Sequence, residues 1–411
     1  MKQLYRRCAG LDVHKETVVA CARIAKGRKV TTETRTFDTT TRGLLSLADW
    51  LEEQGCTHVV MEATGVYWKP VWHVLEPRFD LTLANAAHVK NVPGRKTDVK
   101  DAQWLADLLA HGLVRGSFVP PVAIQAIRDL TRTRKQLMRE QGRHVQRVQK
   151  ILEDANIKLS NVLTDIMGVT GRRILDAIVE GHSDPATLAS FRNGRCKKSE
   201  AEFVDALTGV VTNSHRFLLS MHLSQVDAVR ACVEKLDDEL ARQLEPFRDA
   251  EELLVTIPGI AQVTARVLIA EIGVDMSRFP TEDALRSWAC ICPRNHTSAG
   301  KTLSTRIRKG APWLKDTLVQ AAWAAVRTKD TYLRSLFARL KSRHGPKKAI
   351  VAVASSMLTS IYYMLQRNEP YRDLGPHHFD KLSSRRLARR LAKRIEHLGY
   401  SVVLTPLPKA S

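Results

Sequence analysis

The first 120 residues carry two alternating patterns of apolar positions, one with the period of a strand and one with the period of a helix. The predicted strands are residues 7–14, 17–25, 29–37, 57–65 and 81–86. Helical spacing covers residues 40–55 and 97–112, and each of these segments ends at a glycine. Three consecutive strands, followed by alternating helices and strands, predict an α/β domain over residues 1–120 with a ribonuclease H-like strand order.

Residues 121–250 are predicted to form two long helices with a polar segment between them. The first helix is expected over 121–167 and the second over about 216–247. In the second helix, valine and leucine recur at near-heptad spacing, which is typical of a coiled coil. We therefore predict a long-helix, coiled-coil region whose simplest role is that of a spacer or a dimer contact.

The rest of the chain is predicted to be mainly helical, with a helical domain at 251–370 and a tail at 371–411. Residues 252–272 indicate two short apolar helices joined by a Pro-Gly turn, which resembles a helix-hairpin-helix. Such a turn can face a backbone phosphate or can serve plain packing, and the sequence favours neither. A polar loop is expected over 293–310. The tail contains a basic amphipathic helix over 383–400, which we interpret as an arm for DNA or RNA rather than a membrane anchor.

The charge of the chain indicates the class of its partner. The 64 Lys and Arg residues outnumber 43 acidic residues and give a net charge of +21 at pH 7. A protein this basic usually binds a polyanion, most often nucleic acid, although a generally basic surface is the alternative. We expect neither a membrane-length apolar run nor a signal peptide. The seven scattered cysteines indicate reduced thiols in a cytoplasm, and Cys290 and Cys292 lack partners at zinc-site spacing.

One face of the first long helix is strongly basic. At spacings of three or four, it carries Arg128, Arg132, Lys135, Arg139, Arg143 and Arg147. Most charged helix faces are simply solvated. Here only Asp129 and Glu140 interrupt the basic residues up to position 150, so few ion pairs within the helix are possible. Contact with phosphate is therefore favoured, and the pattern does not distinguish DNA from RNA.

Four carboxylates occupy positions where isolated charge is costly. Asp12 and Glu62 lie toward the C-terminal ends of two predicted buried strands, which share one rim of an α/β sheet. Asp98 and Asp101 lie three apart in the first turn of a helix and begin its apolar stripe. Complementing the helix dipole is the alternative, but it explains acids on an apolar stripe poorly. Hard oxygen ligands without His or Cys suit Mg²⁺ or Mn²⁺, so we predict phosphodiester chemistry at this site.

The loop over 293–310 is the second candidate for chemistry. Ser298 lies between small residues in HTSAGK, and Arg306, Arg308 and Lys309 follow it. An approachable hydroxyl near cations could attack a phosphoryl group. By itself this pattern is weak, because most serine-rich loops have no catalytic role.

Five segments in this order resemble a known family: GLDVHK, VVMEATGVYW, KTDVKDAQWLA, IPGIAQVTA and PRNHTSAGK…RIRKG. Together they are similar to the DEDD transposases of the insertion sequence one-ten family, which includes RNA-guided recombinases. The resemblance covers about residues 6–370. It implies an N-terminal RuvC-like domain, a coiled-coil segment and a mainly helical C-terminal transposase domain.

The resemblance also implies roles for residues and partners. The family's four acids match Asp12, Glu62, Asp98 and Asp101, and its serine nucleophile matches Ser298. Donor and target DNA are the implied substrates, and a structured bridge RNA is the implied guide. Similar proteins form dimers of dimers in which carboxylates and serine of one active site come from different subunits. The implied location is the bacterial cytoplasm, on the nucleoid when DNA is bound, with no membrane partner.

The chain departs from the family pattern at three places. TSAG stands where two serines and two glycines are common, so Thr297 is a second candidate nucleophile. Ala261 replaces a usual glycine, which puts a close approach to phosphate in doubt there. The tail beyond Tyr371 is longer than the family core requires. Two other functions stay open: a magnesium-dependent RuvC-like nuclease or Holliday junction resolvase that uses water, and a non-catalytic nucleic-acid-binding protein.

Overall fold

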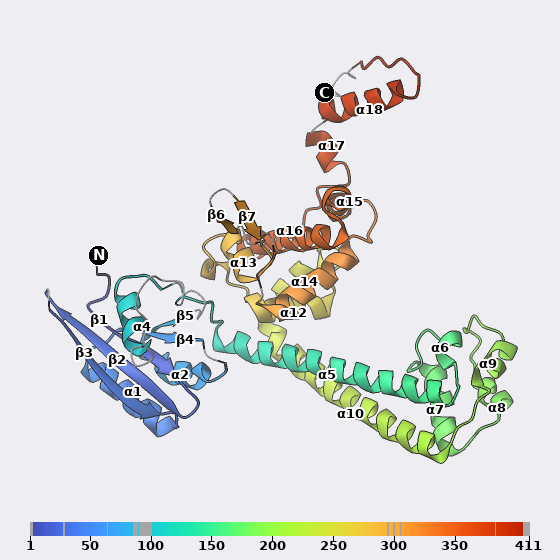
Figure 1. Ribbon diagram of the computed structural model, residues 1–411, viewed down its shortest axis with the longest axis horizontal. Helices are drawn as coiled ribbons and strands as arrows, with labels where there is room; N and C mark the ends of the chain where they lie inside the picture. Colours follow the sequence, from blue (N-terminus) through green and yellow to red (C-terminus); the bar gives the residue numbers. More distant parts are fainter. Residues whose placement is uncertain are drawn as a thin grey trace. The chain divides into compact units, whose positions relative to one another are not determined.

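The computed structural model describes residues 3–27, 29–63, 65–84, 89, 101–114, 116–293, 296–298, 301–304, 306–308, 310–382 and 384–405. The chain divides into two compact units, Met1–Val119 and Pro120–Ser411. The first unit contains a five-stranded sheet, and the second is mainly helical (Figure 1). The predicted combination of an N-terminal α/β region with a helical remainder is therefore confirmed.

The sheet of the first unit has the strand order β3-β2-β1-β4-β5. Its strands are β1 (Arg7–Val13), β2 (Thr17–Lys26), β3 (Lys29–Asp38), β4 (His58–Glu62) and β5 (Asp80–Ala84). The first three pair antiparallel in sequence, whereas β4 pairs parallel with both β1 and β5. The parallel pairs are possible because helical crossovers return the chain to the same end of the sheet.

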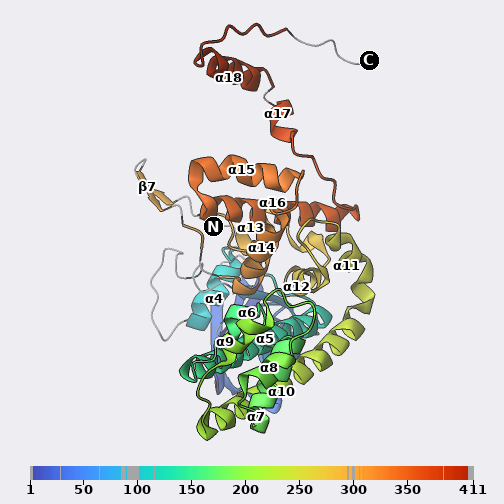
Figure 2. The ribbon, with the colours of Figure 1, turned by 90° about the vertical axis from the view of Figure 1, so that its right-hand side faces the viewer.

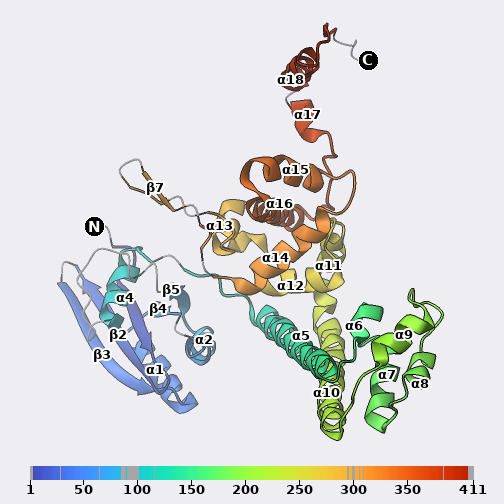
Figure 3. The same cartoon turned by 45° about the vertical axis from the view of Figure 1, so that its right-hand side comes forward.

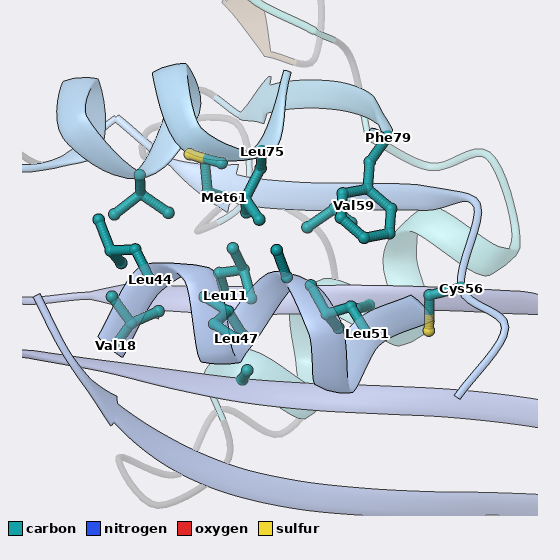
Figure 4. Packing of buried hydrophobic residues seen from close by; sticks show 14 of the residues in the cluster. Leu11, Val18, Leu44, Leu47, Leu51, Cys56, Val59, Met61, Leu75 and Phe79 are labelled. Atoms are coloured by element: carbon teal, nitrogen blue, oxygen red, sulfur yellow. The ribbon is translucent and has the colours of Figure 1, made fainter. Parts of the chain in front are cut away.

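Helices cover both faces of this sheet. On one face, α1 (Thr41–Glu53) and α2 (Trp68–Leu75) pack on alternate residues of the central strands, among them Leu11 and Met61 (Figure 4). On the other face, α4 (Asp101–Ala110) packs with Cys8 and Val60. Successive side chains of a strand point to opposite faces of the sheet. The face of any other residue in β1 or β4 therefore follows from the faces of Leu11, Met61, Cys8 and Val60.

The second unit begins with two long helices that run antiparallel, α5 (Val122–Asp154) and α10 (Asn213–Leu244) (Figure 1). The pairs Arg134–Asp237, His144–His222 and Asp154–His215 show the opposite directions, because the α10 number falls as the α5 number rises. Between them lie α6 (Leu159–Val162), α7 (Val169–Glu180), α8 (Pro185–Ser190) and α9 (Glu200–Leu207). These short helices share an apolar core with the adjoining ends of α5 and α10.

The first long helix is shorter than the sequence predicted. It ends at Asp154, not at 167, because Asn156 takes a left-handed conformation with φ of 56°. Residues 159–162 form the separate helix α6, and α7 starts at Val169. The second long helix lies close to its predicted position.

The remainder of the second unit is built around α16. Its helices are α11 (Arg248–Val255), α12 (Gln262–Ile272), α13 (Glu282–Trp288), α14 (Pro312–Ala325), α15 (Tyr332–His344), α16 (Pro346–Arg367), α17 (His378–Leu382) and α18 (Ser384–Glu396), with short 3-10 turns η2 (Glu245–Phe247) and η3 (Met276–Arg278). α16 packs against α11, α13, α14 and α15, and α15 lies alongside it (Figure 2). A hairpin of β6 (His296–Ser298) and β7 (Lys301–Ser304) leaves this body next to α13 (Figure 3).

By length and composition, α16 could cross a membrane, which the sequence analysis did not expect of any segment. Half of its apolar stretch is buried against the neighbouring helices, as in the core helix of a globular domain. Among the described residues it is the single helix that meets this test.

Candidate active site

The parallel pairing of β1 and β4 places two of the predicted carboxylates side by side. The last paired residues are Leu11 and Met61, and Asp12 and Glu62 each follow directly. Leu11 and Met61 point into the core under α1 and α2. By alternation, Asp12 and Glu62 lie on the opposite face, which α4 covers. The shared rim predicted for these two acids is therefore present.

Gly10 brings α4 close to the same rim. A Cβ at Gly10 would lie 2.1 Å from the carbonyl oxygen of Ala102 and 2.5 Å from the amide of Ala106. Two residues earlier on β1, the Cys8 Sγ donates to the carbonyl of Ala106 at 3.6 Å. Along β1 toward Asp12, the α4 residues that contact the strand therefore lie progressively closer to the start of that helix.

A step of two strand residues, about 6.6 Å, matches roughly four helix residues, about 6 Å. We infer from this step that Asp12 faces the first turn of α4, which begins at Asp101. Asp101 is half-buried, and its Oδ1 is shielded from solvent. Asp98, predicted one turn earlier, lies outside the described residues. The β1–β4 register thus brings Asp12 and Glu62 together, whereas the approach of Asp101 to them stays a prediction.

His14 joins this rim, and the sequence analysis missed it. Its Nε2 lies 3.1 Å from Oδ2 of Asp12, whose side chain is 25% exposed. The two residues are two apart at a strand end, which puts them on one face. That Asp-x-His spacing is the signal that could have identified His14 as a neighbour of the acid.

The chemistry of the rim fits a hard divalent cation. Its donors are carboxylate oxygens, and burial raises the pKa of the nearby Cys8 thiol to about 11, so no thiolate competes at neutral pH. Within the described ranges, no three His, Cys, Asp or Glu side chains are close enough together to enclose a metal. With Asp98 outside those ranges, the complete four-acid set stays a prediction.

Gly10→Ala should test how tightly α4 is held over this rim. The new methyl would overlap the Ala102 carbonyl oxygen, so we expect the free energy of unfolding to fall by about 2 kcal/mol. Urea unfolding followed by circular dichroism measures it. Gly116→Ala is the matched control in the same unit, because its Cβ would meet only the Thr82 methyl at 3.6 Å. Equal stability of the two variants would show that the backbone contact is not tight.

The predicted polar loop around Ser298 is a β-hairpin. Ser298 is the last residue of β6 and pairs with Lys301 at the start of β7. The base of the hairpin is tied to the helical body, since Arg308 Nη2 donates to the carbonyl of Ser287 at 2.8 Å and also to its Oγ. Arg306 is exposed, and Lys309 lies outside the described residues.

The basic face of α5 divides into two parts. Arg132 makes two hydrogen bonds of 2.7 and 2.8 Å to Glu271, a carboxylate that is 1% exposed. Arg128 donates to the backbone carbonyls of Ala270 and Glu271, and burial lowers the pKa of this guanidinium to about 10. These two cations therefore join α5 to α12 in this structure.

Further along α5, the cations become progressively more exposed. Lys135 donates to Thr317 Oγ1 at 3.3 Å, and the Arg139 guanidinium lies 5.4 Å from the ring centre of Trp313. Arg143 and Arg147 are exposed on the same helix. The predicted phosphate contact thus applies best to the last two, because their charges face solvent.

The Pro-Gly turn between α11 and α12 packs against α14. Gly259 has φ of 85°, and a Cβ there would come within 2.4 Å of the Ala325 amide. Ala261 caps α12 without a side-chain hydrogen bond. Of the two alternatives left open for this turn, packing is the one with visible contacts.

None of the seven cysteines, all within the described residues, forms a disulfide.

Comparison with known proteins adds two family matches. A family described as "Transposase", of the DEDD type of IS110, matches residues 9–157, which include the carboxylate rim. A second, described as "Transposase IS116/IS110/IS902 family", matches residues 251–338, which include the Ser298 hairpin.

Three curated relatives span most of the chain. The transposase for insertion sequence element IS1111A of Coxiella burnetii is 25% identical, over 77% of this chain and 79% of its own length. The pilin gene-inverting protein of Moraxella bovis (23%) and the IS1533 transposase of Leptospira borgpetersenii (24%) each match over 88% of this chain and 96% of their own length. The protein therefore belongs to the IS110 family of transposases and is an enzyme that recombines DNA.

Proposed function

We propose that this transposase cuts and rejoins donor and target DNA with Ser298 as nucleophile and the four acids as a magnesium site. The observation that supports the proposal is the β1–β4 register, which brings Asp12 and Glu62 together. The close contact of Gly10 with α4, whose first residue is Asp101, adds to it. Mg²⁺ is the expected ion and Mn²⁺ a substitute, because the donors are carboxylate oxygens. Such ions supply charge neutralisation and Lewis-acid activation at phosphate.

The chain's own residues have two tasks in this reaction. The Ser298 Oγ would bond to phosphorus as the P–O3′ bond breaks. The serine proton would pass to a carboxylate, and the departing 3′ oxygen would take a proton from water to leave as a hydroxyl. After strands exchange, the new 3′ hydroxyl attacks the phosphoserine, loses its proton, and returns the serine as a hydroxyl. The phosphoserine conserves the energy of the phosphodiester, so no nucleotide cofactor is required. Arg306, Arg308 and Lys309 are the proposed cations that neutralise the phosphate.

The proposal includes partners as well as chemistry. A structured bridge RNA would pair with donor and target DNA, and the acids of one copy would act with Ser298 of another copy in a dimer or tetramer. Exposed cations on α5, Arg143 and Arg147, would contact the nucleic-acid backbone. The reaction would take place in the bacterial cytoplasm. These points rest on the family resemblance and on the basic charge of the chain.

Trapping the covalent intermediate tests this function. Wild-type protein is incubated with labelled donor and target DNA, Mg²⁺ and RNA transcribed from the DNA flanking its gene, then denatured in detergent. We expect a protein–DNA adduct that requires both RNA and Mg²⁺, with phosphoserine on the peptide containing Ser298 by mass spectrometry.

Two outcomes would contradict the proposal in different ways. Strand cleavage with no adduct at any time would indicate a nuclease that uses water. An adduct that forms equally well without RNA would remove the guide from the reaction and leave the serine chemistry in place.

A further inference from the structure

We propose that α15, the start of α16 and the C-terminal helix α18 form a binding surface for the phosphate backbone of duplex DNA, separate from the catalytic residues. The proposal requires only that the protein acts on DNA. It does not depend on Ser298, on the metal or on an RNA guide. The second family match ends at residue 338, so α18 lies outside the regions that the family matches cover.

The first observation is that the tail is fixed to α15 by specific contacts. Oδ1 of Asp373 accepts hydrogen bonds from the amides of Tyr332 at 2.9 Å and Gly375 at 2.7 Å. The hydroxyl of Ser335 donates to the carbonyl of Pro376 at 2.6 Å. The Tyr332–Asp373 and Ser335–Pro376 bonds join the segment after α16 to the first turn of α15. The chain is therefore directed back along this helix before α17 begins.

Aromatic contacts continue the attachment into α17. The Phe379 ring stacks on Tyr332 with centres 5.3 Å apart, and His378 meets Tyr332 edge to face at the same separation. The guanidinium of Arg339 lies 4.7 Å from the centre of the Phe379 ring. α18 starts at Ser384, two residues after α17 ends at Leu382, and contacts α17, so the attachment of α17 limits how far α18 can lie from α15.

The second observation is that the charged residues of α15 and α16 are all basic. Between Asp330 and Glu369 the sequence has no acidic residue. The exposed cations of this stretch that lie on α15 and the start of α16 are Arg334, Arg339, Lys341, Arg343, Lys347 and Lys348. Among the described residues, none of these six cations forms an ion pair with an acid; Asp373, bound to the Tyr332 amide, is an acid close to the start of α15. The excess of positive charge creates a positive potential along these helices.

The helix α18 repeats this composition. Its cations are Arg385, Arg386, Arg389, Arg390, Lys393 and Arg394, and its one acid is Glu396. Like charges four residues apart repel and destabilise a helix, and thirteen residues are few for a helix that is stable by itself. A polyanion along this face would relieve the repulsion, which is the physical reason to expect phosphate there.

The apolar side of α18 raises one rival partner. Leu391 and Ile395 are 46% and 42% exposed, and a basic amphipathic helix can also lie on an anionic membrane. DNA is favoured because the enzyme recombines DNA, and because the acid-free stretch of α15 and α16 carries the same charge next to the attached tail.

Salt dependence of binding measures phosphate contacts directly. Full-length protein is titrated with a random-sequence DNA duplex, without divalent cations, at several salt concentrations. The tail variant changes Arg389, Arg390, Lys393 and Arg394 to Gln, and the helix variant changes Arg334, Lys341, Arg343 and Lys347 to Gln. The control changes Arg195, Lys197, Arg230 and Lys235 to Gln. All four are exposed and lie outside the proposed surface, and Arg230 and Lys235 share α10 with the acids Asp227 and Glu234.

Each test variant should lower the slope of log affinity against log salt by about 3, since each phosphate contact contributes about 0.9. Between about 50 and 200 mM salt, wild type would then lose roughly a hundredfold more affinity than the variant. The control, with the same loss of charge, should keep the wild-type slope. The substituted side chains are exposed and glutamine is a good helix former, so folding should be unaffected.

Three results would overturn the proposal. A wild-type slope in either test variant, or an equal fall in the control, removes the specific surface. A change confined to binding of an RNA duplex of the same length assigns the surface to RNA. A change confined to vesicles containing phosphatidylserine assigns α18 to a membrane. None of these depends on strand cleavage, so failure of the proposed serine chemistry would be seen separately.

Discussion

Asp12→Asn is expected to lower the rate of DNA strand cleavage at least about a thousandfold. Asp12 stands at the end of β1 beside Glu62. An amide there would remove one of the proposed charged oxygen ligands without changing the shape of the side chain. Cleavage of labelled donor DNA in Mg²⁺ measures the loss.

A second measurement separates lost chemistry from lost structure. Carboxylates that share a rim repel one another when no cation is bound, so the asparagine variant should be at least as stable as wild type without metal. Added Mg²⁺ should raise the melting temperature of wild type and leave that of the variant unchanged. Glu53→Gln, an exposed acid on α1, is the control that keeps both activity and the metal effect. If Asp12→Asn retains a tenth of the activity, Asp12 is not a metal ligand.

Ser298→Ala should abolish both the covalent adduct and strand exchange, again by at least about a thousandfold, while DNA binding stays normal. The reason is that alanine keeps the hairpin but removes the one oxygen proposed to bond to phosphorus. Adduct yield on denaturing gels and recombinant product together report the effect.

Neighbouring hydroxyls on the same hairpin provide the controls. Thr297→Ala and Ser304→Ala change residues of β6 and β7 and should remain active. An adduct that still forms with Ser298→Ala but not with Thr297→Ala would identify Thr297 as the nucleophile. If two copies share an active site, mixing the Ser298→Ala and Asp12→Asn proteins should restore activity that neither has alone.

The sheet could be predicted from the sequence because its strands are marked by local patterns. Apolar runs and β-rich segments located all five strands to within a few residues. The helix α2 was missed, since it has only eight residues and contains Pro70. That proline lies in the first helical turn, where its missing N–H leaves no hydrogen bond unmade. The end of α5 was misplaced because a single left-handed residue, Asn156, leaves little trace in hydrophobic periodicity.

The site shows a similar limit. Asp12, Glu62 and Asp101 could be proposed from the sequence because each has a marked position, at a strand end or at a helix start. The ion pair of Arg132 with Glu271 could not be predicted from the sequence. The two residues are 139 positions apart and become neighbours only when α12 packs on α5. Periodicity tells which residues share a face of a helix, but it does not tell what covers that face.

The antiparallel pairing of α5 and α10 constrains how this protein can change in length during evolution. The α5 helix is about 50 Å long at 1.5 Å per residue, and side-chain pairs join it to α10 along most of that length. An insertion in one helix alone would shift every later pair out of register. Viable insertions and deletions should therefore occur in both helices together, in steps close to whole heptads, so that α6–α9 move outward or inward as one piece.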